Sequence, residues 1–266
     1  MSSWDPEQYQ RFRDQRRQPF LDLLELVRAQ PAMRVVDLGC GSGELTRILH
    51  RRLGARETLG IDSSDTMLPE RESRSNDGIS LVRRSIEEFQ AIGEYDLVFS
   101  NAALHWLPNH EELFARLATA LTTDGQLAVQ MPANWEQPSH VTAQRVAEEE
   151  PFRRALGGFV HPVHVMAPEA YAVLLHRLGF REQQVRIQIY GHLLDGANDV
   201  VEWVKGSLLT VYRTRLSTEM YDRFVDRYRN LLRSRIGDSQ SFFFTFRRIL
   251  IWAKWGQPPS RPFVEG

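Results

Sequence analysis

The stretch from Val35 to Leu49, VVDLGCGSGELTRIL, decides the fold of this 266-residue chain. An apolar run of strand type leads into three glycines, Gly39, Gly41 and Gly43, and a helical pattern follows at once. In a doubly wound α/β sheet, a glycine-rich turn between a strand and a helix lets a ligand approach the backbone closely. The stretch therefore predicts the first strand, turn and helix of such a sheet.

Short apolar runs alternate with helical patterns beyond this stretch. Strands are predicted at 34–39, 57–62, 79–84, 95–102 and 125–132, and helices at 44–53, 64–72 and 110–121. Alternation at this spacing is typical of parallel strands joined by right-handed crossovers. The sequence therefore predicts an α/β fold with a doubly wound, mostly parallel sheet.

The rhythm changes at both ends of this region. A helix is predicted at 5–29, before Pro31, and further helices are predicted at 142–149, 168–178, 198–216 and 217–235. Two late strands, 181–190 and 241–252, enclose about fifty residues of mainly helical pattern. We expect these strands to complete a seven-stranded sheet as an edge hairpin that carries a helical lid.

The glycine turn lacks the features of a phosphate site. Glu44 stands where a dinucleotide fingerprint has its third glycine, and no Lys-Ser or Lys-Thr follows the glycines. A carboxylate at a helix N-terminus would repel a pyrophosphate. The expected ligand is therefore not phosphorylated there, and a positively charged one suits the turn.

Two acidic residues end the first two predicted strands. Asp37 ends the first, and Asp62, nineteen residues after Gly43, is placed to accept hydrogen bonds from ribose hydroxyls. A nucleoside with a cationic amino-acid tail satisfies both, and S-adenosylmethionine is such a molecule. We expect Asp37 near its ammonium group, the glycine backbone near its amino-acid portion and Asp62 at its ribose.

The composition is that of an ordinary globular protein, with 42% hydrophobic and 25% charged residues. The single cysteine, Cys40, excludes an internal disulfide framework, and no Cys/His cluster has zinc-ligand spacing. The polar start of the chain resembles no signal peptide, and no stretch approaches the ~18 apolar residues of a membrane helix. We expect a cytoplasmic protein with no metal and no membrane partner; the sequence leaves the oligomeric state open, with a monomer as the default.

Charge is unevenly placed along the chain. The net charge is −1, which argues against a general nucleic-acid binder, yet residues 203–256 hold eleven Lys or Arg and only four Asp or Glu. An anionic ligand near this segment is one interpretation. The other is a solvated helix face, because the arginines between 223 and 235 lie in one helical stretch with Asp222 and Asp226 interleaved.

The stretches VVDLGCGSG, LGIDSSDTML and YDLVFSNAALHWL resemble the class I methyltransferases over residues 34–132. The resemblance implies that Ser63 and Met67 border the adenosine and that Asn101 and Ala102 meet the methionine portion, with Trp106 in the same stretch. The family commonly has an acidic residue after the third strand, and Ser85 stands there instead. We expect the Ser85 hydroxyl and the Ile86 amide to bind the adenine.

A closer resemblance, to the trans-aconitate methyltransferases, covers most of the chain through WDPEQYQRF, NAALHWLPNHEELF, LAVQMPANWEQPSHV, EWVKGSLL and FTFRRILIWAKW. It implies methylation of a carboxylate of a small polycarboxylic acid, a reaction that needs no general base because a carboxylate is ionised at neutral pH. No catalytic residue is therefore expected. Cations should hold the other carboxylates: the candidates are Lys205 and Arg248, with Tyr9, Arg16, Trp135, His161 and Tyr212 as further pocket residues.

The resemblance also implies one methyltransferase domain over 1–266. Its expected parts are a helical cap at 1–30, a cofactor-binding core at 31–132, a substrate lid with insertions at 133–241, and a last strand at 242–256. Two departures, Arg247 where a proline is expected and the lack of a proline beside Tyr212, leave the substrate open.

Alternatives therefore remain. One alternative is that the acceptor is another free acid, such as a fatty, juvenoid or acyl-carrier-bound malonyl carboxylate. Another is that the chain is a non-catalytic regulatory protein that keeps a cofactor site. RNA methylation predicts a basic surface and a recognition module that the sequence does not show.

Overall fold

The computed structural model describes residues 13–68, 73–74, 77–237 and 241–256. Its contacts divide the chain into two compact units. The sheet unit comprises Gln18–Pro132, His164–Gln188 and Arg248–Gly266, and the helical unit comprises Met1–Arg17, Ala133–Val163 and Ile189–Arg247. The chain passes between the units several times, twice within strands.

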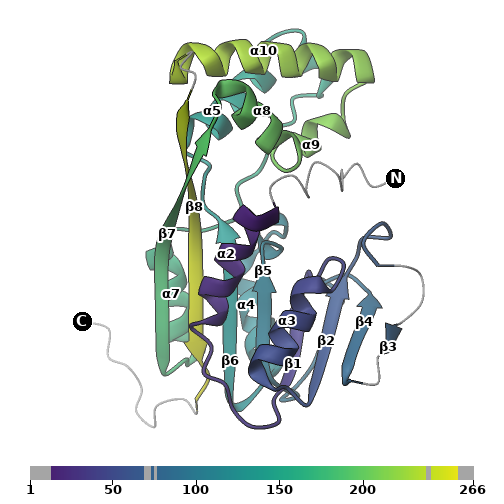
Figure 1. Ribbon diagram of the computed structural model, residues 1–266, viewed down its shortest axis with the longest axis vertical. Helices are drawn as coiled ribbons and strands as arrows, with labels where there is room; N and C mark the ends of the chain where they lie inside the picture. Colours follow the sequence, from purple (N-terminus) through teal and green to yellow (C-terminus); the bar gives the residue numbers. More distant parts are fainter. Residues whose placement is uncertain (1–12, 69–72, 75–76, 238–240, 257–266) are drawn as a thin grey trace. The chain divides into compact units, whose positions relative to one another are not determined.

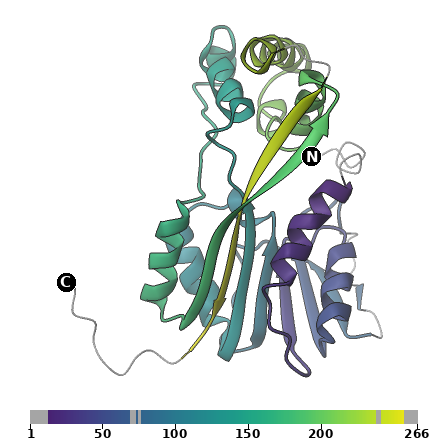
Figure 2. The ribbon, with the colours of Figure 1, turned by 60° about the vertical axis from the view of Figure 1, so that its left-hand side comes forward.

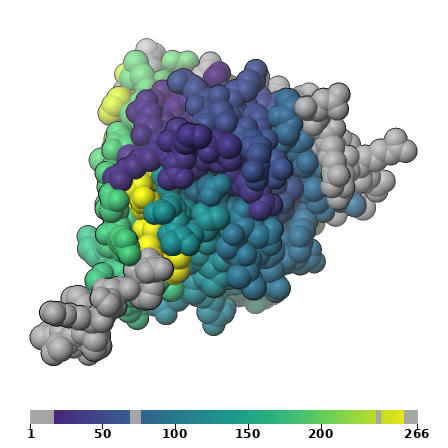
Figure 3. Space-filling model, turned by 90° about the horizontal axis from the view of Figure 1, so that it is seen from below, coloured from purple at the N-terminus to yellow at the C-terminus, as the bar shows by residue number. Residues whose placement is uncertain are grey.

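The strands form one mixed sheet in the order β3-β4-β2-β1-β5-β6-β8-β7 (Figure 1). Strands β4, β2, β1, β5 and β6 are mutually parallel, and β8 runs antiparallel to β6. The strands are β1 (Arg34–Leu38), β2 (Glu57–Asp62), β3 (Ser73–Arg74), β4 (Ile79–Arg83), β5 (Tyr95–Asn101), β6 (Leu121–Pro132), β7 (Glu182–Leu194) and β8 (Phe242–Lys254). Seen from below, β8 of the sheet unit lies between β7 and the central strands (Figure 3). The predicted seven main strands are confirmed, and the two-residue β3 is an addition.

Helices cover both faces of the sheet unit, which makes the sheet doubly wound. Figure 2 shows α2 (Arg13–Leu24) and α3 (Glu44–Leu53) on one face, and α4 (His110–Thr119) and α7 (Pro168–Leu178) on the other. The first face is closed by one apolar cluster, in which Phe20 of α2 packs edge-on against Phe99 of β5 with ring centroids 5.4 Å apart. A short 3-10 helix, η1 (Leu104–Trp106), follows β5.

The helical unit has its own core. Its helices are α5 (Pro138–Glu148), α6 (Phe152–Ala155), α8 (Ala197–Lys205), α9 (Thr210–Arg213) and α10 (Thr218–Ile236). Tyr212 stacks on Phe224 with ring centroids 4.8 Å apart, and the Tyr228 hydroxyl donates to the Ser139 carbonyl at 3.1 Å. Ser217 caps α10 by accepting from the Met220 amide, as its place before the helix favours. Helices α8, α9 and α10 lie between β7 and β8 in the chain, as predicted.

Several predicted boundaries were wrong for identifiable reasons. The single helix expected at 198–216 is two, because α8 ends at Lys205, before Gly206, a residue unfavourable inside a helix. The helix expected at 142–149 begins earlier, where Pro138 occupies its first turn. Residues 64–68 form a turn and no regular helix, and the described part of the first helix ends at Leu24, where tighter turns follow.

Candidate functional site

The glycine turn joins the carboxyl end of β1 to the N-terminus of α3. The amides of Gly39 and Cys40 both donate to the Ile61 carbonyl of β2, at 2.8 and 3.0 Å, so the turn is fixed to the neighbouring strand. Gly39 has a φ of +81°, and a Cβ there would lie 2.1 Å from the Ala103 Cβ. A side chain is therefore excluded at Gly39, because Ala103 packs against the turn at this point.

Asp62 sits at the end of β2, beside this turn. Its Oδ2 accepts from the Gly41 amide and its Oδ1 from the Ser64 amide, each at 2.9 Å. Each carboxylate oxygen still has a lone pair for another donor. The arrangement suits the paired hydroxyls of a ribose, which is the role expected from the sequence.

Asp37, at the end of β1, is only 4% exposed. The Thr46 hydroxyl of α3 donates to its Oδ2 at 2.6 Å. Burial raises the pKa of Asp37 from its ordinary value of 3.8 to about 7, and the nearby Asp62 carboxylate contributes to the rise. A buried acid held near neutrality is electrostatically suited to a cationic group, which would stabilise its ionised form.

Two of the remaining predicted cofactor residues, Met67 and Ile86, lie close to the turn. The Met67 methyl would lie 3.3 Å from a Cβ on Gly41, and the Ile86 Cδ1 would lie 3.8 Å from a Cβ on Gly39. Ser63 is exposed, and Ala102 follows β5 with a φ of +56°. Trp106 of η1 is 46% exposed and packs against His105, with ring centroids 4.7 Å apart.

The Ser85 hydroxyl already has partners within its own loop. It lies 3.2 Å from a Glu87 carboxylate oxygen and accepts from the Glu87 amide at 3.1 Å. Its Oγ is thus less free to bind adenine than the sequence suggested, whereas Glu87 brings a carboxylate to this loop.

Sequence reasoning missed Arg116, which holds the same loop in place. Its Nη1 donates to the carbonyls of Ile86, Glu87 and Phe89 at 3.0, 2.6 and 2.9 Å. The residue lies on α4, about thirty residues away in the chain. In the sequence it cannot be told apart from any other arginine on a helix surface. Only the packing of α4 against the sheet brings it to the loop.

Two predicted residues lie at the carboxyl ends of β5 and along β8. Asn101 ends β5, and its Oδ1 is buried without a hydrogen-bond partner among the described residues. Arg248 of β8 is 7% exposed and pairs in register with Pro132 of β6. Both belong to the sheet unit, together with the glycine turn and its two acids.

The other predicted acceptor residues with described side chains belong to the helical unit. The Lys205 ammonium lies 2.8 Å from the Glu202 carboxylate, and His161 Nδ1 lies 2.8 Å from the Pro162 carbonyl. Tyr212 is 1% exposed in the aromatic core, which favours a packing role, and Trp135 is half-buried. Tyr9 lies outside the described residues, and Arg16 belongs to α2 but its side chain is not among those described.

Metal-binding groups and membrane-spanning helices are both absent from the described part of the chain. No three His, Cys, Asp or Glu side chains among those residues are grouped so that they could hold a metal ion. None of the described helices is long and apolar enough to cross a membrane.

The chain resembles known proteins at two levels. Residues 9–185 match the family described as "Methyltransferase domain". The trans-aconitate 2-methyltransferase of Deinococcus radiodurans is 38% identical over 257 residues, covering 94% of this chain and 98% of the relative. The protein of the same name from Mycobacterium tuberculosis is 36% identical, covering 95% and 97%.

Solved structures share the fold at low sequence identity. The YcgJ protein of Bacillus subtilis has a TM-score of 0.57 at 13% identity, covering 91% of this chain and 99% of that one. A phosphoethanolamine N-methyltransferase 2 of Haemonchus contortus, solved with S-adenosyl-L-methionine, has a TM-score of 0.53 at 17% identity, covering 91% of this chain and 53% of that one. These likenesses support the sheet order described above.

Proposed function

Since this chain belongs to the trans-aconitate 2-methyltransferase family and is an S-adenosylmethionine-dependent methyltransferase, we propose that it esterifies one carboxylate of trans-aconitate. The products are a monomethyl ester and S-adenosylhomocysteine. The proposal of this acceptor rests on the names of relatives that are 36–38% identical over nearly the whole chain.

The observation that carries the cofactor assignment is the pair of acids beside the glycine turn. Asp37 and Asp62 end adjacent parallel strands, and the first glycine of the turn excludes a side chain. A pair of carboxylates with no cation from the turn matches a cationic nucleoside and mismatches a phosphate. We assign the ribose to Asp62 and the ammonium group to Asp37.

The rest of the cofactor assignment follows the same geometry. Met67 and Ile86 would border the adenosine, because both lie over the glycine turn. Asn101 and Ala102, at the end of the neighbouring strand β5, would meet the methionine portion. These assignments place cofactor binding within residues 31–132, as the resemblance implies.

The chemistry asks little of the protein beyond positioning. When bound, S-adenosylmethionine supplies an electrophilic methyl group, and an ionised carboxylate attacks it without a general base, since its ordinary pKa is about 4. Holding both reactants in line and excluding water can contribute several kcal/mol. The chain then needs groups that bind the non-reacting carboxylates, and the assignment of Lys205 and Arg248 to this task stays a prediction.

Release of S-adenosylhomocysteine from purified protein tests the proposal. The acceptors are trans-aconitate, cis-aconitate, citrate, isocitrate and a medium-chain fatty acid, each with S-adenosylmethionine. Turnover chiefly on trans-aconitate supports the proposal. Turnover on the fatty acid alone would contradict it and favour another free acid, and cofactor binding without turnover on any acid would favour a regulatory protein. An Asp62→Ala variant, expected to lose the cofactor, gives the background rate.

Further expectations from the sequence accompany the proposal. The helical cap at 1–30 and the substrate lid at 133–241 stay predictions. A small carboxylic acid is the proposed binding partner, and the monomer stays a prediction. A cytoplasmic location stays a prediction from the sequence.

A further inference from the structure

Strand β6 carries two glutamines, Gln126 and Gln130, within an otherwise apolar run. Both side chains are completely buried, at 0% exposure. Because side chains alternate along a strand, both lie on the face of Ala128, which belongs to the apolar cluster under α2 and α3. The two residues thus share strand, face and burial, and their hydrogen bonding can be compared directly.

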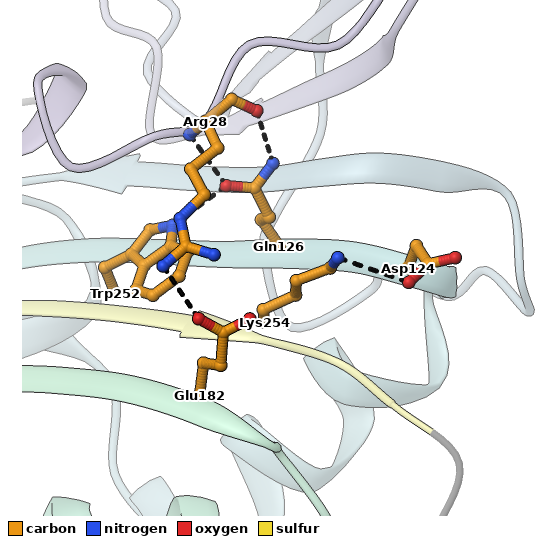
Figure 4. A network of polar contacts seen from close by, with 6 residues as sticks. All are labelled: Arg28, Asp124, Gln126, Glu182, Trp252 and Lys254. Atoms are coloured by element: carbon orange, nitrogen blue, oxygen red, sulfur yellow. Dashed lines mark hydrogen bonds and ion pairs between the residues drawn. The ribbon is translucent and has the colours of Figure 1, made fainter.

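Gln126 forms hydrogen bonds through both its oxygen and its nitrogen (Figure 4). Its Oε1 accepts from the Arg28 amide and from the Trp252 indole, both at 2.9 Å, and its Nε2 donates to the Arg28 carbonyl at 2.7 Å. The Arg28 guanidinium in turn stacks 4.5 Å over the Trp252 ring and pairs with Glu182. Gln126 is therefore a structural residue that ties the segment after α2 to β6 and β8.

Gln130 has no such hydrogen bonds within the part of the chain that the structure describes. Neither its Nε2 nor its Oε1 has a hydrogen-bond partner among the residues that the structure describes. Burying an amide without partners is unfavourable, and native proteins rarely retain one without a function. A side chain of this kind, at the carboxyl end of a parallel strand, is placed where open α/β sheets bind ligands.

The neighbours of Gln130 form a polar row across the carboxyl edge of the sheet unit. Asn101 of β5 lies directly opposite Gln130 in register and also has a buried oxygen without a partner among the described residues. Arg248 of β8 lies on the same face as Leu250, which pairs with Gln130. Diagonal neighbours of this kind are within reach of long side chains.

The charge of the row changes sign across the sheet. In the strand order β2-β1-β5-β6-β8, the polar residues at or near this edge are Asp62, Asp37, Asn101, Gln130 and Arg248. Negative charge thus lies on the side of the glycine turn, positive charge on the side of β8, and two neutral amides lie between. A cationic cofactor suits the first side, and an anionic acid suits the second.

We propose that Gln130 is an acceptor-binding residue, whose Nε2 donates to a carboxylate oxygen of the anionic acid beside Arg248. This rests on the proposed function and deepens it by naming a recognition group in the sheet unit. The amide donates a hydrogen bond to the acid without adding charge near the reacting carboxylate. The attacking oxygen of that carboxylate therefore keeps its nucleophilicity. The same bond satisfies the donor of a buried group that has no partner among the described residues.

Two substitutions at Gln130 and one at Gln126 test the proposal. Gln130→Leu removes the donor at similar volume and should lower kcat/KM for trans-aconitate ~10- to 100-fold, mainly through KM. Gln130→Glu keeps the shape but places a like charge against the acid, and should lower kcat/KM further. In both variants the dissociation constant of S-adenosylmethionine, measured by calorimetry, should stay within about twofold of wild type.

Gln126→Leu is the matched control, because it removes a glutamine from the same face of the same strand. It should lower the midpoint of thermal unfolding and leave the acceptor KM unchanged, whereas Gln130→Leu should keep or raise that midpoint. Wild-type KM values in both Gln130 variants would overturn the proposal. Tighter cofactor binding in Gln130→Glu, with an unchanged acceptor KM, would also overturn it, because the amide would then face the cofactor. If the wild type esterifies none of the acids, the proposed function fails first and this inference falls with it.

Discussion

Replacing Asp37 by asparagine should make the protein more stable while weakening its hold on the cofactor. The carboxyl is buried and its pKa rises from 3.8 to about 7 in the folded protein. Between these values the folded state binds more protons than the unfolded state, so the wild type loses stability as pH rises through this window. A shift of one pKa unit corresponds to about 1.4 kcal/mol. Above pH 7, the buried Asp37 carboxylate therefore lowers the free energy of unfolding by about 4 kcal/mol in total.

Asparagine is neutral at every pH and keeps an oxygen for the Thr46 hydroxyl. The gain in free energy of unfolding of Asp37→Asn over the wild type should therefore be near zero around pH 4, about 2 kcal/mol at pH 5 and about 4 kcal/mol at pH 8. Urea unfolding of both proteins at each pH measures this gain. The contributions of all other titrating groups cancel in the difference between the two proteins. A gain that is the same at pH 5 and pH 8 would refute the reasoning.

Ionisation of the same carboxylate, which lowers the stability of the protein, should strengthen cofactor binding. A cationic ligand stabilises ionised Asp37, so the dissociation constant of S-adenosylmethionine should fall as pH rises through 7 in the wild type. Asp37→Asn should bind more weakly at pH 8 and lose this pH dependence. Glu94→Gln, which removes an exposed carboxylate, is the control and should change neither the stability difference nor the binding profile.

Three further substitutions probe the loops and the helical core. Gly39→Ala should abolish cofactor binding in a titration, because the new methyl meets Ala103; Gly93→Ala, also at positive φ but with open space around it, should bind normally. Arg116→Met should raise the cofactor's dissociation constant on the order of tenfold, because three loop carbonyls lose their donor. Tyr228→Phe should lower the free energy of unfolding by about 1 kcal/mol in urea, because its hydroxyl bonds a backbone carbonyl, with cofactor affinity unchanged.

The sheet could be predicted because its signals are local. Each strand of the parallel core is a short apolar run, and each is bounded by turn residues that sequence alone displays. The predicted helix at 44–53 matches α3 residue for residue, since Gly43 and Gly54 stand on either side of it in left-handed conformations. The helix expected at 198–216 was wrong because the apolar spacing continues past Gly206 while the backbone does not.

The site could be predicted only where chemistry and chain position coincide. Asp37 and Asp62 follow directly from the ends of adjacent strands, so sequence spacing placed both near the glycine turn. Arg116 and Gln130 gave no such signal. Arg116 lies on α4 and bonds the loop that contains Ile86, about thirty residues earlier in the chain. Gln130 is the same residue type as Gln126 on the same strand and differs from it only in its hydrogen-bond partners. Tertiary packing decides both roles.

Mass spectrometry of the methylated product tests the central claim most directly. Purified protein is incubated with trans-aconitate and S-adenosylmethionine that carries a trideuterated methyl group. The account predicts a single new species, an aconitate monoester in which one trideuteromethyl group replaces a carboxyl proton. It should form in step with S-adenosylhomocysteine. Unlabelled or absent ester in the presence of bound cofactor would contradict it.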